Sequence, residues 1–145
     1  MNNWLLFLYK IPPQPTSGRV YVWRKLKKIG AVLLHDSVWI LPENSRTLEQ
    51  FQWLAAEITE LGGEAQLWRS QAELAQQEPA IVEQFLSQVN KIYEQILEEL
   101  NQNDDADLTA LSRKYQQTHI QDYFQSELGK KVREALLNAP GGMQT

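Results

Sequence analysis

The first 70 residues alternate between short apolar runs and amphipathic stretches, and a proline or glycine follows almost every one of them. Short runs rich in aliphatic and aromatic residues indicate buried strands, whereas apolar residues spaced three and four apart indicate a helix. The segments follow the order strand, helix, strand, strand, helix, strand. We place them at residues 4–9, 17–29, 31–34, 38–41, 45–61 and 64–69.

This order predicts a ferredoxin-like βαββαβ unit over residues 1–70, in which an antiparallel sheet carries both helices on one face. Ser17 is expected to cap the first helix, and Gly30 is expected to end it. Residues 35–37 are expected to form the turn of a β-hairpin. The second helix is expected to stop at Gly62 and Gly63.

Residues 71–145 predict a helical extension. Apolar residues keep a three-four rhythm over 81–100, and further helical stretches cover 108–124 and 126–138. Asp104 or Asp105 is placed to cap the second of these helices. The fold class is therefore α+β, with a ferredoxin-like front half followed by an amphipathic helical half. We expect the two halves to pack together as one compact domain.

The first strand is apolar on both of its faces, because every residue of the run 4–9 is aliphatic or aromatic. Two helices can cover only one face of the sheet. The helical half or a second copy of the chain is therefore expected to cover the other face.

The chain has 145 residues and no cysteine, which excludes disulfides, thiolate nucleophiles and cysteine-ligated metal sites. The apolar run at 4–9 is far shorter than the roughly 20 residues that a membrane-spanning helix needs. We therefore expect a cytoplasmic protein that has no cofactor and does not enter a membrane.

No group of residues points to catalysis or to a metal site. His35 and Asp36 form a pair found in metal phosphohydrolases, but the chain has only one other histidine, His119. The pair is therefore interpreted as part of a turn, and His119 as a packed or partly exposed interface residue. The aspartates at 104, 105 and 107 lack the glycine and glutamate of a calcium loop. We predict no enzymatic activity.

The first helix is strongly basic. Its cations are expected opposite an apolar side that includes Val22, Trp23 and Leu26, and residues 11–35 contain no acidic residue. Residues 1–69 carry eight Lys and Arg against six Asp and Glu, whereas residues 70–145 carry six against twelve. The basic side is either an ordinary solvated surface or a contact for phosphate or another oxyanion. The candidate contacts are Arg19, Arg24, Lys25, Lys27 and Lys28.

Two other anion-binding or base-binding features are possible. The run Ser17-Gly18-Arg19, where the first helix amides and an arginine meet after the proline-rich loop, could hold an anion. Trp4, Trp39 and Trp68 lie on expected strands and could stack on bases, but they alternate with aliphatic residues. Packing in a core or an interface is the stronger interpretation for these tryptophans.

Several blocks of the sequence resemble, in the same order, the N-terminal domain of the ChrB family. They are Trp4–Pro12, Arg19–Val32, Asp36–Pro42, Phe51–Ile58, Gly62–Ala65 and Asp122–Phe124. The resemblance implies a cytoplasmic protein of the chromate-resistance response, usually a DNA-binding transcriptional regulator that senses the oxyanion. Members of the family generally carry a second, C-terminal domain, before which this chain stops.

The front half is also similar to small ferredoxin-like domains of CRISPR-associated endonucleases and of phenylacetate-pathway repressors. The nucleases bind metal through an aspartate at the end of the first strand, where this chain has Tyr9 and Lys10. Nuclease activity is therefore not implied.

We accordingly predict a ChrB-like regulatory protein that binds DNA, chromate or another oxyanion through its first helix. We expect it to form a homodimer or to bind a partner protein that supplies the missing C-terminal domain. The alternative is a non-enzymatic module for protein interaction, such as dimerisation. An oxyanion-handling enzyme is the least supported class, because a chain without cysteine would have to borrow a redox cofactor.

Overall fold

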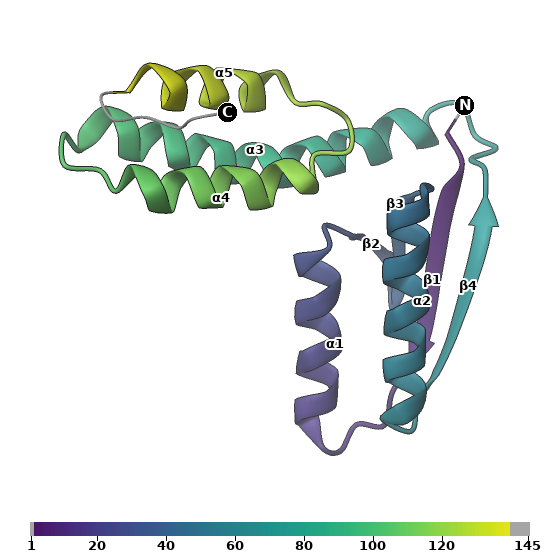
Figure 1. Cartoon of the computed structure of the whole chain (residues 1–145). Coiled ribbons are helices and arrows are strands. Elements are labelled where there is room, and N and C mark those ends of the chain that lie inside the picture. The colour runs from purple at the N-terminus through teal and green to yellow at the C-terminus, as the bar shows by residue number, and fades with distance from the viewer. Residues whose placement is uncertain (1, 140–145) are drawn as a thin grey trace. The chain divides into compact units, whose positions relative to one another are not determined.

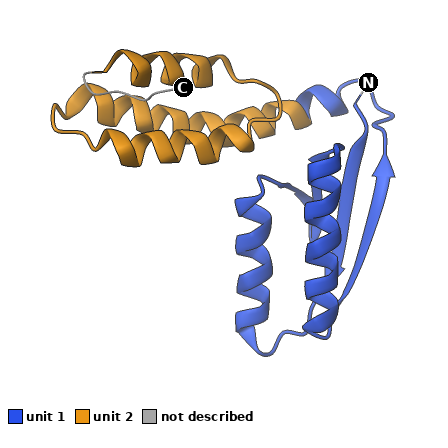
Figure 2. Ribbon diagram, in the orientation of Figure 1, with its two compact units in different colours: residues 1–80 blue, residues 81–145 orange. Residues whose placement is uncertain are grey.

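The computed structural model describes residues 2–139 of the chain. It contains four strands and five helices in these residues (Figure 1), namely β1 (Trp4–Lys10), α1 (Thr16–Lys28), β2 (Val32–His35), β3 (Val38–Pro42), α2 (Ser45–Glu60), β4 (Glu64–Ser70), α3 (Gln77–Gln102), α4 (Leu108–Ile120) and α5 (Glu127–Asn138). The chain forms two compact units, residues 1–80 and residues 81–145, which Figure 2 shows in blue and orange. Helix α3 begins in the first unit and continues into the second.

The first unit confirms the predicted ferredoxin-like topology. Its four strands lie in the order β2-β3-β1-β4, and each neighbouring pair is antiparallel. Helices α1 and α2 lie on the same face of this sheet (Figure 1). Phe7 of β1 pairs with Trp39 of β3 and stacks on Phe51 of α2, with ring centroids 4.7 Å apart. This contact fixes the face of β1 that the helices cover.

The core of the first unit consists of apolar side chains from the sheet and from the inner sides of both helices. Burying one such aliphatic or aromatic side chain stabilises the fold by about 1.5–3 kcal/mol. The most deeply buried of them are Trp4, Leu5, Phe7, Val22, Leu26, Leu41, Phe51, Leu54 and Ile58.

Helix α1 ends as predicted but begins differently. Gly30 has a φ of 83°, and the amides of Gly30 and Ala31 donate to the carbonyls of Lys27 and Leu26, at 3.1 Å in both cases. This pair of hydrogen bonds around a glycine in the left-handed conformation is a Schellman motif. The predicted capping role of Ser17 is wrong, because the helix starts at Thr16 after Pro15 and has no side-chain cap. Pro15 occupies the N-cap position with an extended backbone conformation, and its side chain has no atom that could accept a hydrogen bond from the first helix amides.

Helix α2 begins with a capping box. The Thr47 amide donates to Asn44 Oδ1 at 2.8 Å, and the Asn44 amide donates to Thr47 Oγ1 at 2.9 Å. These bonds satisfy two amides that a helix start would otherwise leave without partners. Gly62, with a φ of 86°, ends the helix as expected.

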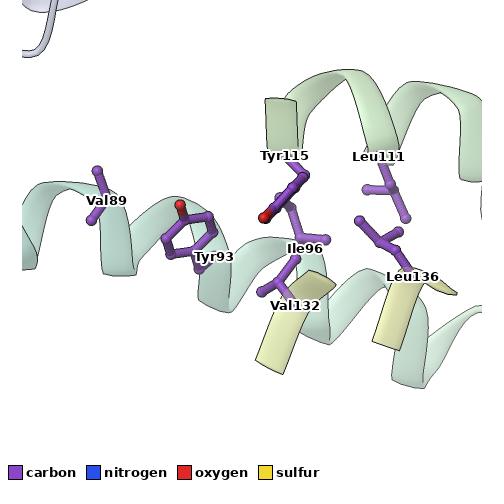
Figure 3. Close-up of a cluster of buried hydrophobic side chains, with 7 residues drawn as sticks. All are labelled: Val89, Tyr93, Ile96, Leu111, Tyr115, Val132 and Leu136. Carbon is purple, nitrogen blue, oxygen red and sulfur yellow. The ribbon is translucent and has the colours of Figure 1, made fainter. Parts of the chain in front are cut away.

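The second unit is a three-helix arrangement of α3, α4 and α5. Its core consists of side chains contributed by all three helices, which Figure 3 shows: Val89, Tyr93 and Ile96 from α3, Leu111 and Tyr115 from α4, and Val132 and Leu136 from α5. Helix α3 is longer than the predicted 81–100, whereas α4 ends at Ile120 rather than at 124. Apolar spacing marks the buried middle of a helix better than its ends.

The helix caps of the second unit depart from the prediction. Asp107, rather than Asp104 or Asp105, caps α4 by accepting the Ala110 amide at 3.0 Å. Ser126 caps α5. We predicted that the helical half packs on the front half as one domain and covers the second face of the sheet. Both statements stay predictions.

Candidate phosphate-binding surfaces of helix α1

The cations of α1 lie mostly at the surface. Arg19, Arg24, Lys27 and Lys28 are exposed, and Lys25 is half-buried. The apolar side of the helix is narrower than predicted. Val22 and Leu26 are fully buried, but Trp23 is 51% exposed, which corrects its assignment to the core side. Trp23 directly follows Val22, and one residue is enough to rotate a side chain out of a narrow buried stripe.

The five candidate contacts do not share one side of the helix. Arg24, Lys25 and Lys28 follow Tyr21 at three, four and seven residues, so they lie on the side of Tyr21. Arg19 and Lys27 lie four residues on either side of Trp23 and therefore share a different side with it. Val22 and Leu26 lie between the two groups on the buried side of the helix, and Val20 lies between them on the exposed side.

The first group, Arg24, Lys25 and Lys28, is called the α2-facing cations. Tyr21 donates its hydroxyl hydrogen bond to the Glu57 carboxylate of α2, which shows that this side of α1 faces α2. The same bond raises the pKa of Tyr21. Trp53 lies one turn before Glu57 and is 67% exposed. Residues one turn apart share a side of a helix, so Trp53 lies on the side of α2 that bears Glu57.

Arg19 and Trp23 border a hollow beside α1. The hollow has a volume of about 670 Å³. Its wall is formed by the end of β1, the loop after β1, the side of α1 that bears Trp23, and the turn between β2 and β3. The lining residues are Tyr9, Lys10, Ile11, Thr16, Arg19, Val20, Trp23 and Ser37. Lys27 lies over the Trp23 ring, with its Nζ 5.9 Å from the ring centroid. A cation at this distance is attracted by the face of the indole.

Tyr9 forms the inner wall of this hollow. Burial raises the pKa of its hydroxyl, while the hydrogen bond with Trp39 and the positive charge of Arg19 oppose the rise. Tyr9 and Arg19 both line the hollow, so the tyrosine hydroxyl and the guanidinium border the same space. Tyr9, Lys10 and Trp23 were not among the predicted contacts. The sequence signal for this region was the proline-rich loop after β1, and Ile11 and Thr16 at its two ends line the hollow together with Lys10.

The remaining candidate residues have structural roles. His35 ends β2 and Asp36 lies in the hairpin turn, where Ser37 has a φ of 56°. His119 is exposed but stacks on Tyr115, with ring centroids 5.6 Å apart. Within the described residues, no group of three or more His, Asp or Glu side chains is arranged to hold a metal ion.

The three strand tryptophans differ in exposure. Trp4 and Trp39 are buried, as expected for core residues, and the Trp4 indole donates to Glu78 Oε1 at 3.0 Å. Trp68 is 57% exposed, so it is not a core residue, and packing in an interface stays a prediction for it. Its indole donates to Gln66 Oε1, two residues earlier on β4, at 3.0 Å.

Asp122 organises the loop between α4 and α5. Its carboxylate accepts the Tyr93 hydroxyl at 2.9 Å and the Ser126 amide at 3.0 and 3.1 Å. The rings of Tyr123 and Phe124 both contact Phe85 of α3. The block Asp122–Phe124 therefore holds the second unit together. Among helices in residues 2–139, none has the length and apolarity that crossing a bilayer requires.

Comparisons with known proteins agree with the resemblance noted in the sequence. The sequence model of the family described as "Protein ChrB, N-terminal" matches residues 19–140. The curated Protein ChrB of Cupriavidus metallidurans is 31% identical over 75 residues, which cover 52% of this chain. The match covers only 23% of that protein, so the chain corresponds to a minor part of it. The family match spans most of the chain, and we conclude that the chain belongs to the ChrB N-terminal family.

Proposed function

We propose that this protein acts in regulation of the chromate-resistance response and binds the phosphate backbone of DNA through the α2-facing cations. The observation that carries the proposal is that Arg24, Lys25 and Lys28 share one side of α1 in a segment, residues 11–35, without acidic residues. Membership of the ChrB N-terminal family supports the regulatory role. Cations on an exposed helix bind phosphate without reading the base sequence.

The position of these cations also has a structural explanation, which the test has to separate from binding. Lys25, Lys27 and Lys28 lie in the last turn of α1, where positive charge interacts favourably with the helix dipole. Each such charge contributes about 0.3–1 kcal/mol to helix stability. Arg24 lies before this turn, so the dipole accounts for it less well.

The test measures binding of a short labelled duplex DNA by fluorescence anisotropy. Glutamine retains a high helix propensity and removes the charge, so the variant is Arg24→Gln/Lys25→Gln/Lys28→Gln. The matched control removes three exposed cations from the second unit: Lys91→Gln/Arg113→Gln/Lys131→Gln. We expect the first variant to weaken binding by roughly tenfold or more and the control to change it much less. Equal loss in both variants would contradict the proposal.

The same variants distinguish DNA from a free oxyanion. If the surface binds chromate rather than DNA, calorimetric titration with chromate gives saturable heat that the α1 variant abolishes, and anisotropy shows no binding of the duplex. That result would replace DNA by the oxyanion in the proposal. Thermal unfolding of each variant, followed by circular dichroism, shows that the differences do not arise from unfolding.

A further inference from the structure

We propose that the hollow beside α1 binds a nucleotide, with the base on the Trp23 indole and a phosphate between Lys10 and Arg19. This site uses the side of α1 that bears Arg19 and Lys27, so it does not rest on DNA binding by the α2-facing cations. The shared ligand chemistry is a planar aromatic ring attached to a phosphate. A free mononucleotide and the 5′-phosphorylated end of a strand both provide it.

The size of the hollow suits such a ligand. Its volume of about 670 Å³ lies within the range of roughly 300–1,000 Å³ that is typical of small-molecule sites. Its wall combines an apolar part, formed by Ile11, Val20 and Trp23, with a polar part. Small-molecule sites commonly have this composition, with apolar walls and a few polar groups that orient the ligand.

The polar part of the wall favours a phosphate. Lys10 and Arg19 both line the hollow, and no carboxylate is among its lining residues. Thr16 and Ser37 add two hydroxyl groups that can donate hydrogen bonds. Two cations match the charge of a phosphate monoester, which is between −1.5 and −2 near pH 7. The guanidinium can bind two phosphate oxygens at once, and the lysine adds a second point charge.

Arg19 has little structural reason to occupy its position. It lies in the first turn of α1, where the helix dipole disfavours a cation, and no acidic side chain occupies that turn. Residues that break a local stability rule without compensation tend to mark functional sites. Arg19 lines the hollow together with Lys10 and Thr16, so it borders the space that the phosphate would occupy.

Trp23 provides the surface for the base. The indole is 51% exposed although it is large and apolar, and Lys27 lies over the ring. An aromatic ring has two faces, and stacking of a base on an aromatic side chain is a common means of nucleotide recognition. The second face of the Trp23 ring is proposed to take the base.

The test follows the five tryptophan indole N–H signals of the full ¹⁵N-labelled chain by NMR. The Trp23→Phe variant assigns the Trp23 signal. AMP is titrated first, and adenosine and inorganic phosphate serve as ligands that lack the phosphate or the base. We expect AMP to shift the Trp23 signal saturably and to bind at least about tenfold more tightly than either fragment. Binding of adenosine as tight as that of AMP would overturn the phosphate contact.

Two further arms complete the test. Arg19→Gln is expected to weaken AMP binding by about tenfold or more, whereas the matched Arg113→Gln in α4 leaves it unchanged. The other indole signals report whether each variant remains folded. A short 5′-phosphorylated oligonucleotide that shifts Trp23 when AMP does not assigns the ligand to a strand end. If neither ligand shifts Trp23, the proposal is overturned, whatever the result with duplex DNA.

Discussion

Replacing Gly129 by alanine tests the packing of α5 against α3. A Cβ atom at this position would lie 2.8, 2.9 and 3.0 Å from Cε2, Cζ and the hydroxyl oxygen of Tyr93. Tyr93 is fully buried, and its hydroxyl is held by Asp122 at 2.9 Å. The ring therefore cannot move aside without straining the core or losing this hydrogen bond.

The expected effect is the difference between two opposing contributions. The new Cβ costs about 1–3 kcal/mol if it strains the core, or about 1.5–3 kcal/mol if the ring moves and the hydrogen bond to Asp122 is lost instead. Alanine in place of glycine contributes up to about 1 kcal/mol of helix propensity in the other direction. We expect Gly129→Ala to lower the free energy of unfolding by up to about 3 kcal/mol, and by about 1–3 kcal/mol relative to a helix glycine that has room for a Cβ.

Urea denaturation followed by circular dichroism measures this change. The matched control is Gly18→Ala in α1, where the new Cβ would lie 3.5 Å from Ile11 Cδ1, an ordinary contact distance. Helix propensity alone then acts, so the control is expected to be as stable as the natural chain or more stable by up to about 1 kcal/mol. A Gly129→Ala variant as stable as Gly18→Ala would refute the packing argument.

Three other predictions follow from the caps and titrating groups. Asn44→Ala removes the side-chain acceptor for the Thr47 amide and is expected to lower the free energy of unfolding by about 1 kcal/mol, measured by urea denaturation. Burial raises the pKa of Tyr93, and the hydrogen bond to Asp122 and the charge of Asp122 raise it further. The protonated Tyr93 hydroxyl therefore contributes fully to the stability of the fold below about pH 10, and this contribution is lost at higher pH. Tyr93→Phe should reduce the decrease in thermal unfolding temperature between pH 9 and 11. Hydrogen bonds from the Asn2 amide and the Trp4 indole lower the pKa of Glu78. The contribution of the Glu78 carboxylate to stability is therefore present above about pH 4.3 and is lost in more acid solution. Glu78→Gln should weaken this acid dependence of the thermal unfolding temperature, measured over a series of pH values.

Oligomeric state is open to a direct measurement. Multi-angle light scattering gives the mass of the full chain in solution, and the predicted homodimer requires twice 16.8 kDa. A mass of one chain at all concentrations would contradict the homodimer.

The fold of the first unit could be predicted from the sequence because local signals and packing agree there. Gly30 and Gly62 have φ values of 83° and 86°, which only glycine adopts readily, so the helix ends were visible in the sequence. The apolar run of β1 places Phe7 against Phe51, as strand alternation requires.

The helix starts were less predictable, since several polar residues near each start could act as caps. Ser17, Asp104 and Asp105 are all suitable by residue type, yet Pro15 and Asp107 occupy the cap positions. The backbone path into the helix makes this choice, and sequence spacing does not record it.

The candidate site could also be predicted only in part from the sequence. The sequence identified the cations of α1, but it placed them on one side opposite Trp23. The contact of Tyr21 with Glu57 shows which side faces α2, and the hollow shows that Lys10, far away in the sequence from Trp23, borders the same space. Both facts depend on how α1 is rotated on the sheet, and the helical period alone does not fix that rotation.

The salt dependence of DNA binding tests the central claim most directly. Each phosphate contact made by a cation adds roughly 0.9 to the magnitude of the slope of log K against log salt concentration. We predict that Arg24→Gln/Lys25→Gln/Lys28→Gln makes this slope shallower by roughly three units relative to the natural chain. An unchanged slope, with binding still measurable, would show that the α2-facing cations do not contact DNA phosphates.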